Sequence, residues 1–99
     1  MSFNYSMIST EKYPVISNYT FNYRLENPHD LETLSIHIEG ILNGQKYSTS
    51  KITKLYFDRS LVMTDSGTYY KLNSLNLQNK KYYNNNIQFM INKGILQYN

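Results

Sequence analysis

The stretch LSIHIEGILNGQKYSTSKITKLYFDRSLVMTDSGTYYKL, residues 34–72, decides the fold of this 99-residue chain. Its apolar and β-branched residues alternate with polar ones in short runs, which is the pattern of β-strands with one buried face. Short polar turns separate the runs, and connections this short join antiparallel neighbours. We therefore predict an antiparallel β-meander that bends strongly, as a small barrel does, to bury one face.

Turn residues divide this stretch into four predicted strands. Asn43-Gly44 is the favoured pair for a type I′ hairpin turn. In Asp65-Ser66-Gly67, glycine supplies the positive φ that a tight turn needs. Asp58-Arg59-Ser60 forms a third polar turn. The strands predicted between these turns are 33–42, 46–57, 61–64 and 68–72.

Two further segments flank the meander. Residues 15–25 alternate aromatic and polar side chains until Asn27-Pro28 ends the pattern, which predicts a fifth strand. Near the C-terminus, apolar residues at helical spacing and the final Asn92-Lys93-Gly94 predict a helix over 79–93. The expected fold class is α+β and mostly β: an antiparallel meander of four to five strands with a C-terminal helix.

Two of these assignments have alternatives. Residues 31–42 also carry apolar side chains at helical spacing, so this segment has a helical interpretation. The Asn84–Asn86 triplet competes with helix hydrogen bonding, and a hairpin that turns at the triplet is the alternative to the C-terminal helix.

The length predicts a single domain with one core. Within it we expect a loosely attached segment 1–14, the meander over 15–73 and a helical segment over 74–99. The chain has no cysteine, which excludes disulfides and thiolate metal sites. No leader pattern and no apolar run of spanning length occur, so we expect a cytoplasmic protein without a membrane partner.

Charge and aromatic content favour a binding function. The net charge is +3, the chain holds 11 tyrosines, and residues 66–99 contain four lysines and no acid. Lysine interleaved with tyrosine is typical both of single-strand nucleic-acid binding and of protein interfaces. The candidate binding residues are Lys46, Lys54, Tyr56, Arg59, Tyr69, Lys71, Lys80, Lys81, Tyr82 and Tyr83.

Catalytic signals are few, and we predict no enzyme, no cofactor and no metal. Asp58 and Asp65 lack a third nearby acid that would complete a cation-binding loop. His37 and Glu39 would share one strand face and, with Arg59, supply the residue types of a small ribonuclease, which is a remote alternative. The plainer interpretation of these residues is the polar, solvated face of an antiparallel sheet.

The pattern TS-x-I followed by V-x-T-x-SGT-x-Y-x-L spans Thr49 to Leu72. It resembles short proteins of bacteria, phages and plasmids, which implies a small β-fold common on mobile elements. Frequent Asn, Lys, Ile and Tyr without Ala are typical of an AT-rich genome.

We therefore predict a non-catalytic protein that acts through a protein–protein surface on a host protein or ribonucleoprotein complex. A phage or mobile-element inhibitor, like anti-CRISPR proteins in kind, fits this description. The alternative is a β-protein that binds single-stranded nucleic acid. A homodimer is compatible with either function.

Overall fold

The computed structural model describes residues 13–98. Within this range one seven-stranded sheet is covered by one α-helix, α2 (Tyr83–Asn92). Short 3₁₀ helices occur at Leu31–Thr33, Phe57–Arg59 and Leu77–Tyr82. The strands are β1 (Val15–Leu25), β2 (Leu34–Leu42), β3 (Gln45–Ser48), β4 (Ile52–Tyr56), β5 (Leu61–Thr64), β6 (Tyr69–Leu75) and β7 (Leu96–Gln97).

The sheet is mixed, with the strand order β3-β2-β1-β6-β5-β4-β7. β1 pairs in parallel with β6, and β4 pairs in parallel with β7, while the other neighbours are antiparallel. The mostly β fold with a C-terminal helix is confirmed. The antiparallel meander of four to five strands is wrong, because β1 and β7 pair with strands far away in the chain, and no local pattern specifies such pairing.

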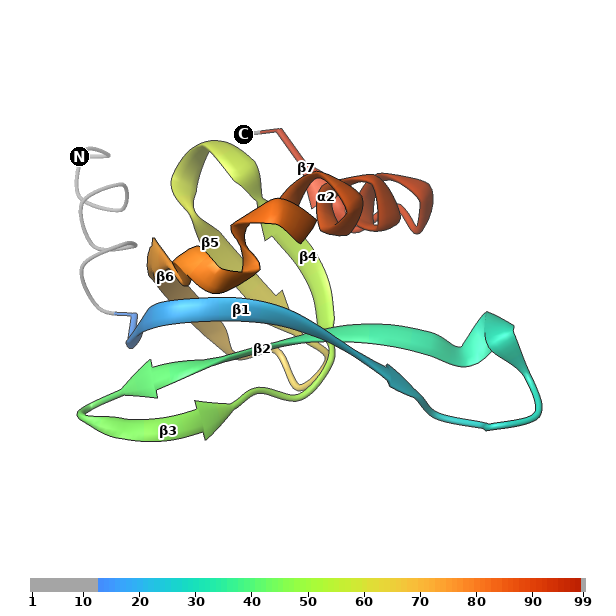
Figure 1. The fold of residues 1–99 in the computed structure, drawn as a ribbon, viewed down its shortest axis with the longest axis horizontal. Helices are drawn as coiled ribbons and strands as arrows, with labels where there is room; N and C mark the ends of the chain where they lie inside the picture. The colour runs from blue at the N-terminus through green and yellow to red at the C-terminus, as the bar shows by residue number, and fades with distance from the viewer. Residues whose placement is uncertain (1–12, 99) are drawn as a thin grey trace, which may run out of the picture.

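The predicted strand 46–57 is also wrong as one element, since it divides into β3, at one end of the strand order, and β4, next to the last strand at the other end. Thr49 lies at the break, just after β3 ends. Its N–H donates to the Ile38 carbonyl (2.9 Å), and its hydroxyl accepts from the Ile38 N–H (3.0 Å). The short link 49–51 joins two strands that lie far apart in the sheet, so the sheet curls strongly, as Figure 1 shows.

Other local predictions are confirmed. The strand predicted over 33–42 is present as β2 (Leu34–Leu42), and the helical alternative is wrong for this stretch, since only Leu31–Thr33 form a short 3₁₀ helix. Asn43 and Gly44 both have positive φ, 53° and 81°, as a type I′ turn requires. Gly67, in the tight turn between β5 and β6, has a φ of 85°.

Gly40 of β2 lies against an irregular part of β1. The β1–β2 register shifts between Ser17 and Thr20, where Asn18 has a φ of 53°. A Cβ on Gly40 would lie 2.6 Å from the Ile16 Cγ2 and 2.7 Å from the Ser17 carbonyl oxygen. Only glycine lets the two backbones approach this closely.

The helix α2 covers the inner face of the β1–β2 hairpin (Figure 1). Its Met90 is fully buried in the core, and the ring of Phe89 meets that of Tyr23 edge to face at 5.0 Å. The Tyr23 hydroxyl donates to Asn86 Oδ1 over 2.7 Å. The predicted C-terminal helix is confirmed from Tyr83 onward, and the hairpin alternative is wrong.

The residues before Tyr83 form a 3₁₀ helix rather than the start of the α-helix. The Asn76 side chain caps this segment by accepting from the Gln78 N–H (2.9 Å). No helix within residues 13–98 is long and apolar enough to cross a membrane. Most of the segment 1–14 lies outside the described residues, but the Pro14 carbonyl accepts a hydrogen bond from the Lys71 N–H (2.8 Å).

Candidate functional site

The outer face of β4, β5 and β6 gathers half of the predicted binding residues. Residues paired across neighbouring strands point to the same face of a sheet. Lys54 pairs with Met63, and Met63 pairs with Tyr69. In the adjoining row Leu61 pairs with both Tyr56 and Lys71. Tyr13, which precedes β1, and Arg59, which precedes β5, complete the group. We call these eight residues the basic tyrosine face: Tyr13, Lys54, Tyr56, Arg59, Leu61, Met63, Tyr69 and Lys71.

Three tyrosine rings stack across this face. The rings of Tyr13 and Tyr69 lie 5.3 Å apart with an interplanar angle of 27°. The rings of Tyr56 and Tyr69 lie 6.5 Å apart at 23°. Tyr13 precedes β1 on one side of β6, whereas Tyr56 belongs to β4 on the other, so Tyr69 is the central ring.

The rings cover apolar surface outside the main core. Leu61 is only 2 % exposed although it does not belong to the core cluster and lies on the outer face. Its cross-strand partners are Tyr56 and Lys71, whose side chains stand beside it on the same face of the sheet. The stack therefore has a structural role in addition to the surface that it presents.

Cations surround the stack. Lys71 Nζ donates to the Arg59 carbonyl oxygen over 2.9 Å, which joins the two residues at one end of the face. Burial is the main cause that raises the pKa of Tyr69, Tyr56 acts in the same direction, and the Arg59 charge opposes them. The Tyr69 hydroxyl therefore stays neutral at pH 7, and the face carries the side chains of three cationic residues, Lys54, Arg59 and Lys71.

The structure places the other predicted binding residues elsewhere. Lys46 lies on β3 and lines a shallow groove that also includes Thr20 and Glu39. Tyr83 packs against Phe21 (6.2 Å between centroids) and is half-buried, and burial raises its pKa. Three residues form a separate exposed basic strip on the 3₁₀ helix: Lys80, Lys81 and Tyr82.

Sequence reasoning missed Tyr13 because the segment 1–14 lacks a strand pattern. It also treated Leu61 and Met63 as strand formers without a surface role. The alternation of Tyr69 and Lys71 with the buried Tyr70 and Leu72 was visible in the sequence, and it does define one side of this face.

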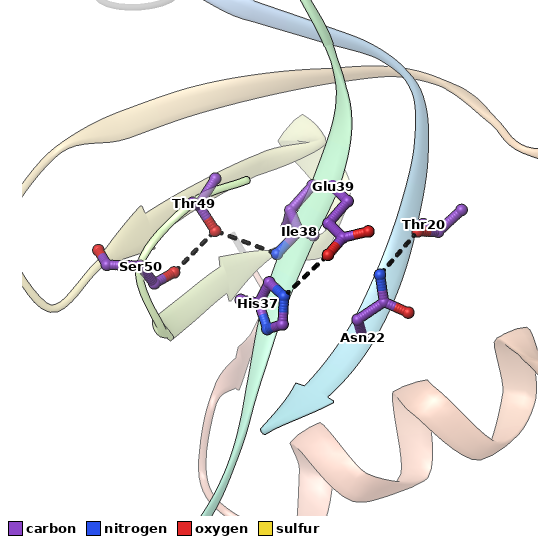
Figure 2. Close-up of polar contacts among 7 residues, drawn as sticks. All are labelled: Thr20, Asn22, His37, Ile38, Glu39, Thr49 and Ser50. Carbon is purple, nitrogen blue, oxygen red and sulfur yellow. Dashed lines mark hydrogen bonds and ion pairs between the residues drawn. The ribbon is translucent and has the colours of Figure 1, made fainter. Parts of the chain in front are cut away.

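A polar cluster occupies the outer face of β1 and β2 (Figure 2). His37 Nε2 and Glu39 Oε2 lie 3.3 Å apart, with side-chain exposures of 6 % and 50 %. Asn22 and Thr20 are their cross-strand partners on β1, and Asn22 Nδ2 donates to Thr20 Oγ1 over 3.3 Å. The strand alternation that the sequence predicted does place His37 and Glu39 side by side.

The structure brings together two of the three residues that the sequence suggested for a ribonuclease, His37 and Glu39. His37 Nδ1 is buried without a hydrogen-bond partner among the described residues, and Nε2 is engaged by Glu39. Arg59 belongs to the basic tyrosine face instead, next to Lys71.

Within residues 13–98, no group of three His, Asp or Glu side chains is placed to hold a metal ion. No protein-family model, curated protein or solved structure matches the chain. The functional inference therefore rests on the geometry of its own surfaces.

Proposed function

We propose that this chain is a non-catalytic binding protein that engages a partner protein through the basic tyrosine face. The observation that carries the proposal is the stack of Tyr13, Tyr69 and Tyr56, with Lys54, Arg59 and Lys71 around it. Tyrosine and arginine are the residue types most often found at the energetic centres of protein interfaces.

The stacked arrangement favours a protein partner over bases. Neighbouring rings already flank Tyr69 on both sides, so no base can stack on the central ring without displacing one of them. Mutual contact also holds the rings in place before binding, which lowers the entropic cost of forming an interface.

The charge of the face indicates the chemistry of the partner. Its ionised side chains are all cations, and the nearest acid in sequence is Asp58, beside Arg59. A complementary surface would be acidic around an apolar centre that packs on the rings. By occupying such a surface the protein would act sterically, as expected of a mobile-element inhibitor of host machinery.

A nuclease-treated pull-down tests this proposal. Wild-type protein should retain one dominant partner from a lysate of the source cells. The variant Tyr69→Ala/Arg59→Glu should lose it, because the variant removes the central ring and reverses one charge. The variant Lys46→Glu/Lys80→Glu changes charge on other surfaces and should keep the partner.

Retention of the partner by the Tyr69→Ala/Arg59→Glu variant would contradict the proposal, provided that the variant is folded by circular dichroism. Loss of the partner in the Lys46→Glu/Lys80→Glu control would equally contradict it, since binding would then depend on net charge rather than on the face.

Single-stranded nucleic acid is the second candidate partner, favoured by the same combination of rings and cations. Titration with a labelled oligonucleotide at low and moderate salt distinguishes it. Contacts from Lys54, Arg59 and Lys71 to phosphates would give an affinity that falls steeply with salt. Weak binding that is independent of Tyr69 would leave the protein partner as the preferred function.

A further inference from the structure

The β1–β2 hairpin projects from the body of the protein and carries an exposed leucine at its tip. β1 ends at Leu25 and β2 begins at Leu34, so residues 26–33 form the tip (Figure 1). Leu31 in this tip is 78 % exposed, and no residue of its 3₁₀ turn is buried. A single exposed leucine is ordinary on a protein surface, and it gains meaning here from the side chains around it.

Acidic side chains flank Leu31. Residues 26–32 hold three of the chain's seven acids, Glu26, Asp30 and Glu32, and no Lys or Arg. None of the three carboxylates forms an ion pair with another residue of the described chain. Two cations lie toward the body: Arg24 on β1, and Lys93, whose Nζ donates to the Glu32 carbonyl oxygen over 3.4 Å. The tip therefore presents an apolar side chain between carboxylates that lack a cationic partner.

Local hydrogen bonds fix the shape of the tip. Asp30 Oδ1 accepts from the Glu32 N–H (3.0 Å), and Thr33 Oγ1 donates to the Asp30 carbonyl oxygen (2.7 Å). Asn27 Oδ1 accepts from the His29 N–H (3.0 Å). Because the backbone is already ordered, docking of the tip loses less conformational entropy than docking of a mobile loop.

The basic tyrosine face has the complementary chemistry. Its stacked rings and the half-buried Met63 form an apolar centre, and Lys54 and Lys71 lie beside it. An acidic surface around an apolar group fits such a face, and the tip is a surface of this kind. In Figure 1 the tip lies at the far right, well away from β5 and β6. The tip of one molecule therefore meets this face only on another molecule.

We propose that the tip of one copy docks on the basic tyrosine face of a second copy of the chain. Leu31 packs on the tyrosine rings, and the acids of the tip pair with Lys54 and Lys71. The inference rests on the proposed function, since it names an occupant of the same face. Because the two surfaces differ, the contact is head-to-tail, and an open assembly keeps one tip and one face free. Self-association then competes with the partner protein for the face.

Two variants test the head-to-tail contact by sedimentation velocity. The wild-type mass should rise between about 1 μM and about 1 mM protein. Leu31→Asp changes the tip and keeps the face, whereas Lys54→Glu/Tyr69→Ala changes the face and keeps the tip. Each variant alone should associate at least about tenfold more weakly than the wild type.

A mixture of the two variants is the decisive sample. Leu31→Asp supplies an intact face and Lys54→Glu/Tyr69→Ala supplies an intact tip, so the mixture should form a heterodimer and nothing larger. Contacts between two tips or between two faces would not give this result. Lys54→Glu alone, at an exposed side chain, takes the place of the double variant if the latter does not fold.

Leu77→Asp is the matched control. Leu77 is 79 % exposed, as Leu31 is, but it lies on the 3₁₀ helix Leu77–Tyr82, outside both surfaces. This variant should associate like the wild type. Higher salt should weaken the association of both proteins, because it screens the charges that meet in the contact.

Three results would overturn the inference: a wild-type protein that stays monomeric over this range, a mixture without heterodimer, or an equal loss of association in Leu77→Asp. None of them bears on the partner protein. The nuclease-treated pull-down with Leu31→Asp tests the proposed function separately, since this variant keeps the face. It should retain at least as much partner as the wild type. Loss of the partner in Leu31→Asp would assign the tip to the partner protein and would also overturn the inference.

Discussion

The two halves of the curled sheet cover the same core, but their outer faces differ in chemistry. On β4–β6, stacked rings and long cationic side chains cover an apolar residue, Leu61. On β1–β2, hydrogen bonds join Thr20 to Asn22 and His37 to Glu39, and the buried His37 Nδ1 has no hydrogen-bond partner within residues 13–98.

This difference between the two outer faces predicts that they contribute unequally to the stability of the protein. Burying an aliphatic side chain contributes several times more free energy than a half-exposed ion pair. The free energy of unfolding should therefore fall strongly when side chains on the outer face of β4–β6, the aromatic half, are truncated. For β1–β2, the polar half, the free energy of unfolding should depend mainly on how closely the two backbones pack.

The largest effect is expected where the backbones of the polar half approach most closely. Gly40→Val would place a side chain within 2.6 Å of Ile16 Cγ2, which forces β1 and β2 apart. We expect the free energy of unfolding to fall by more than about 3 kcal/mol. Urea denaturation measures this. Gly44→Ala is the control, since nothing lies near its Cβ and only its φ of 81° is strained, so it should cost about 1 kcal/mol.

The aromatic half should be most sensitive at the residue beneath the rings. Leu61→Ala removes a side chain that is 2 % exposed, and we expect a loss of about 2–3 kcal/mol in the free energy of unfolding. The half-buried Met63 is the matched position on the same strand and face, and Met63→Ala should cost clearly less. An equal cost for both variants, measured by urea denaturation, would show that the rings do not cover Leu61.

A hydroxyl pair that joins the two halves predicts a pH dependence. The Tyr47 and Tyr70 hydroxyls lie 2.7 Å apart, and burial, followed by the effect of Tyr47, raises the pKa of Tyr70 from 10.0 to about 12. The folded state thus favours the protonated hydroxyl. Stability should be complete below pH 10.0 and should fall as the pH rises toward about 12.

The replacement Tyr70→Phe should reduce this alkaline loss without abolishing it. Burial also raises the pKa of Tyr19 to about 12, so Tyr19 contributes a similar loss in the variant. The free energy of unfolding measured in urea at several alkaline pH values checks the prediction. A pH profile identical to that of the wild type would contradict the role of Tyr70.

The smallest effect is expected for the contact between His37 and Glu39 on the outer face of β2. Glu39 is half exposed, so solvent screens its interaction with His37. We expect Glu39→Gln to change the free energy of unfolding by less than about 0.5 kcal/mol. Thermal denaturation of the Glu39→Gln and Leu61→Ala variants under the same conditions would compare the two losses of stability directly. A loss as large as that of Leu61→Ala would remove the contrast between the two faces.

The elements that depend on neighbouring residues could be predicted from the sequence, whereas those that depend on distant residues could not. Residues 15–25 and 34–42 were predicted within a residue as strands, because their side chains alternate and turn residues bound them. The α-helix was found, but its start was not, since Asn76 caps a 3₁₀ helix ahead of it.

The candidate site was predictable in part for the same reason. Tyr69 and Lys71 share a face because they are two residues apart on one strand. That Tyr56 and Tyr13 join them depends on the neighbours that β4 and β6 acquire in the sheet. Lys46 was grouped with Lys54 because the break at Thr49 depends on a hydrogen bond to Ile38, which no local pattern reveals.

The sequence by itself determined β1, β2, β5 and β6 and the tight turns at Gly44 and Gly67, because alternation and positive φ are properties of neighbouring residues. The tertiary structure alone decided that β1 and β7 pair in parallel with distant strands. That long-range pairing also assembled the ring stack, because the stack depends on which strands become neighbours when the sheet curls.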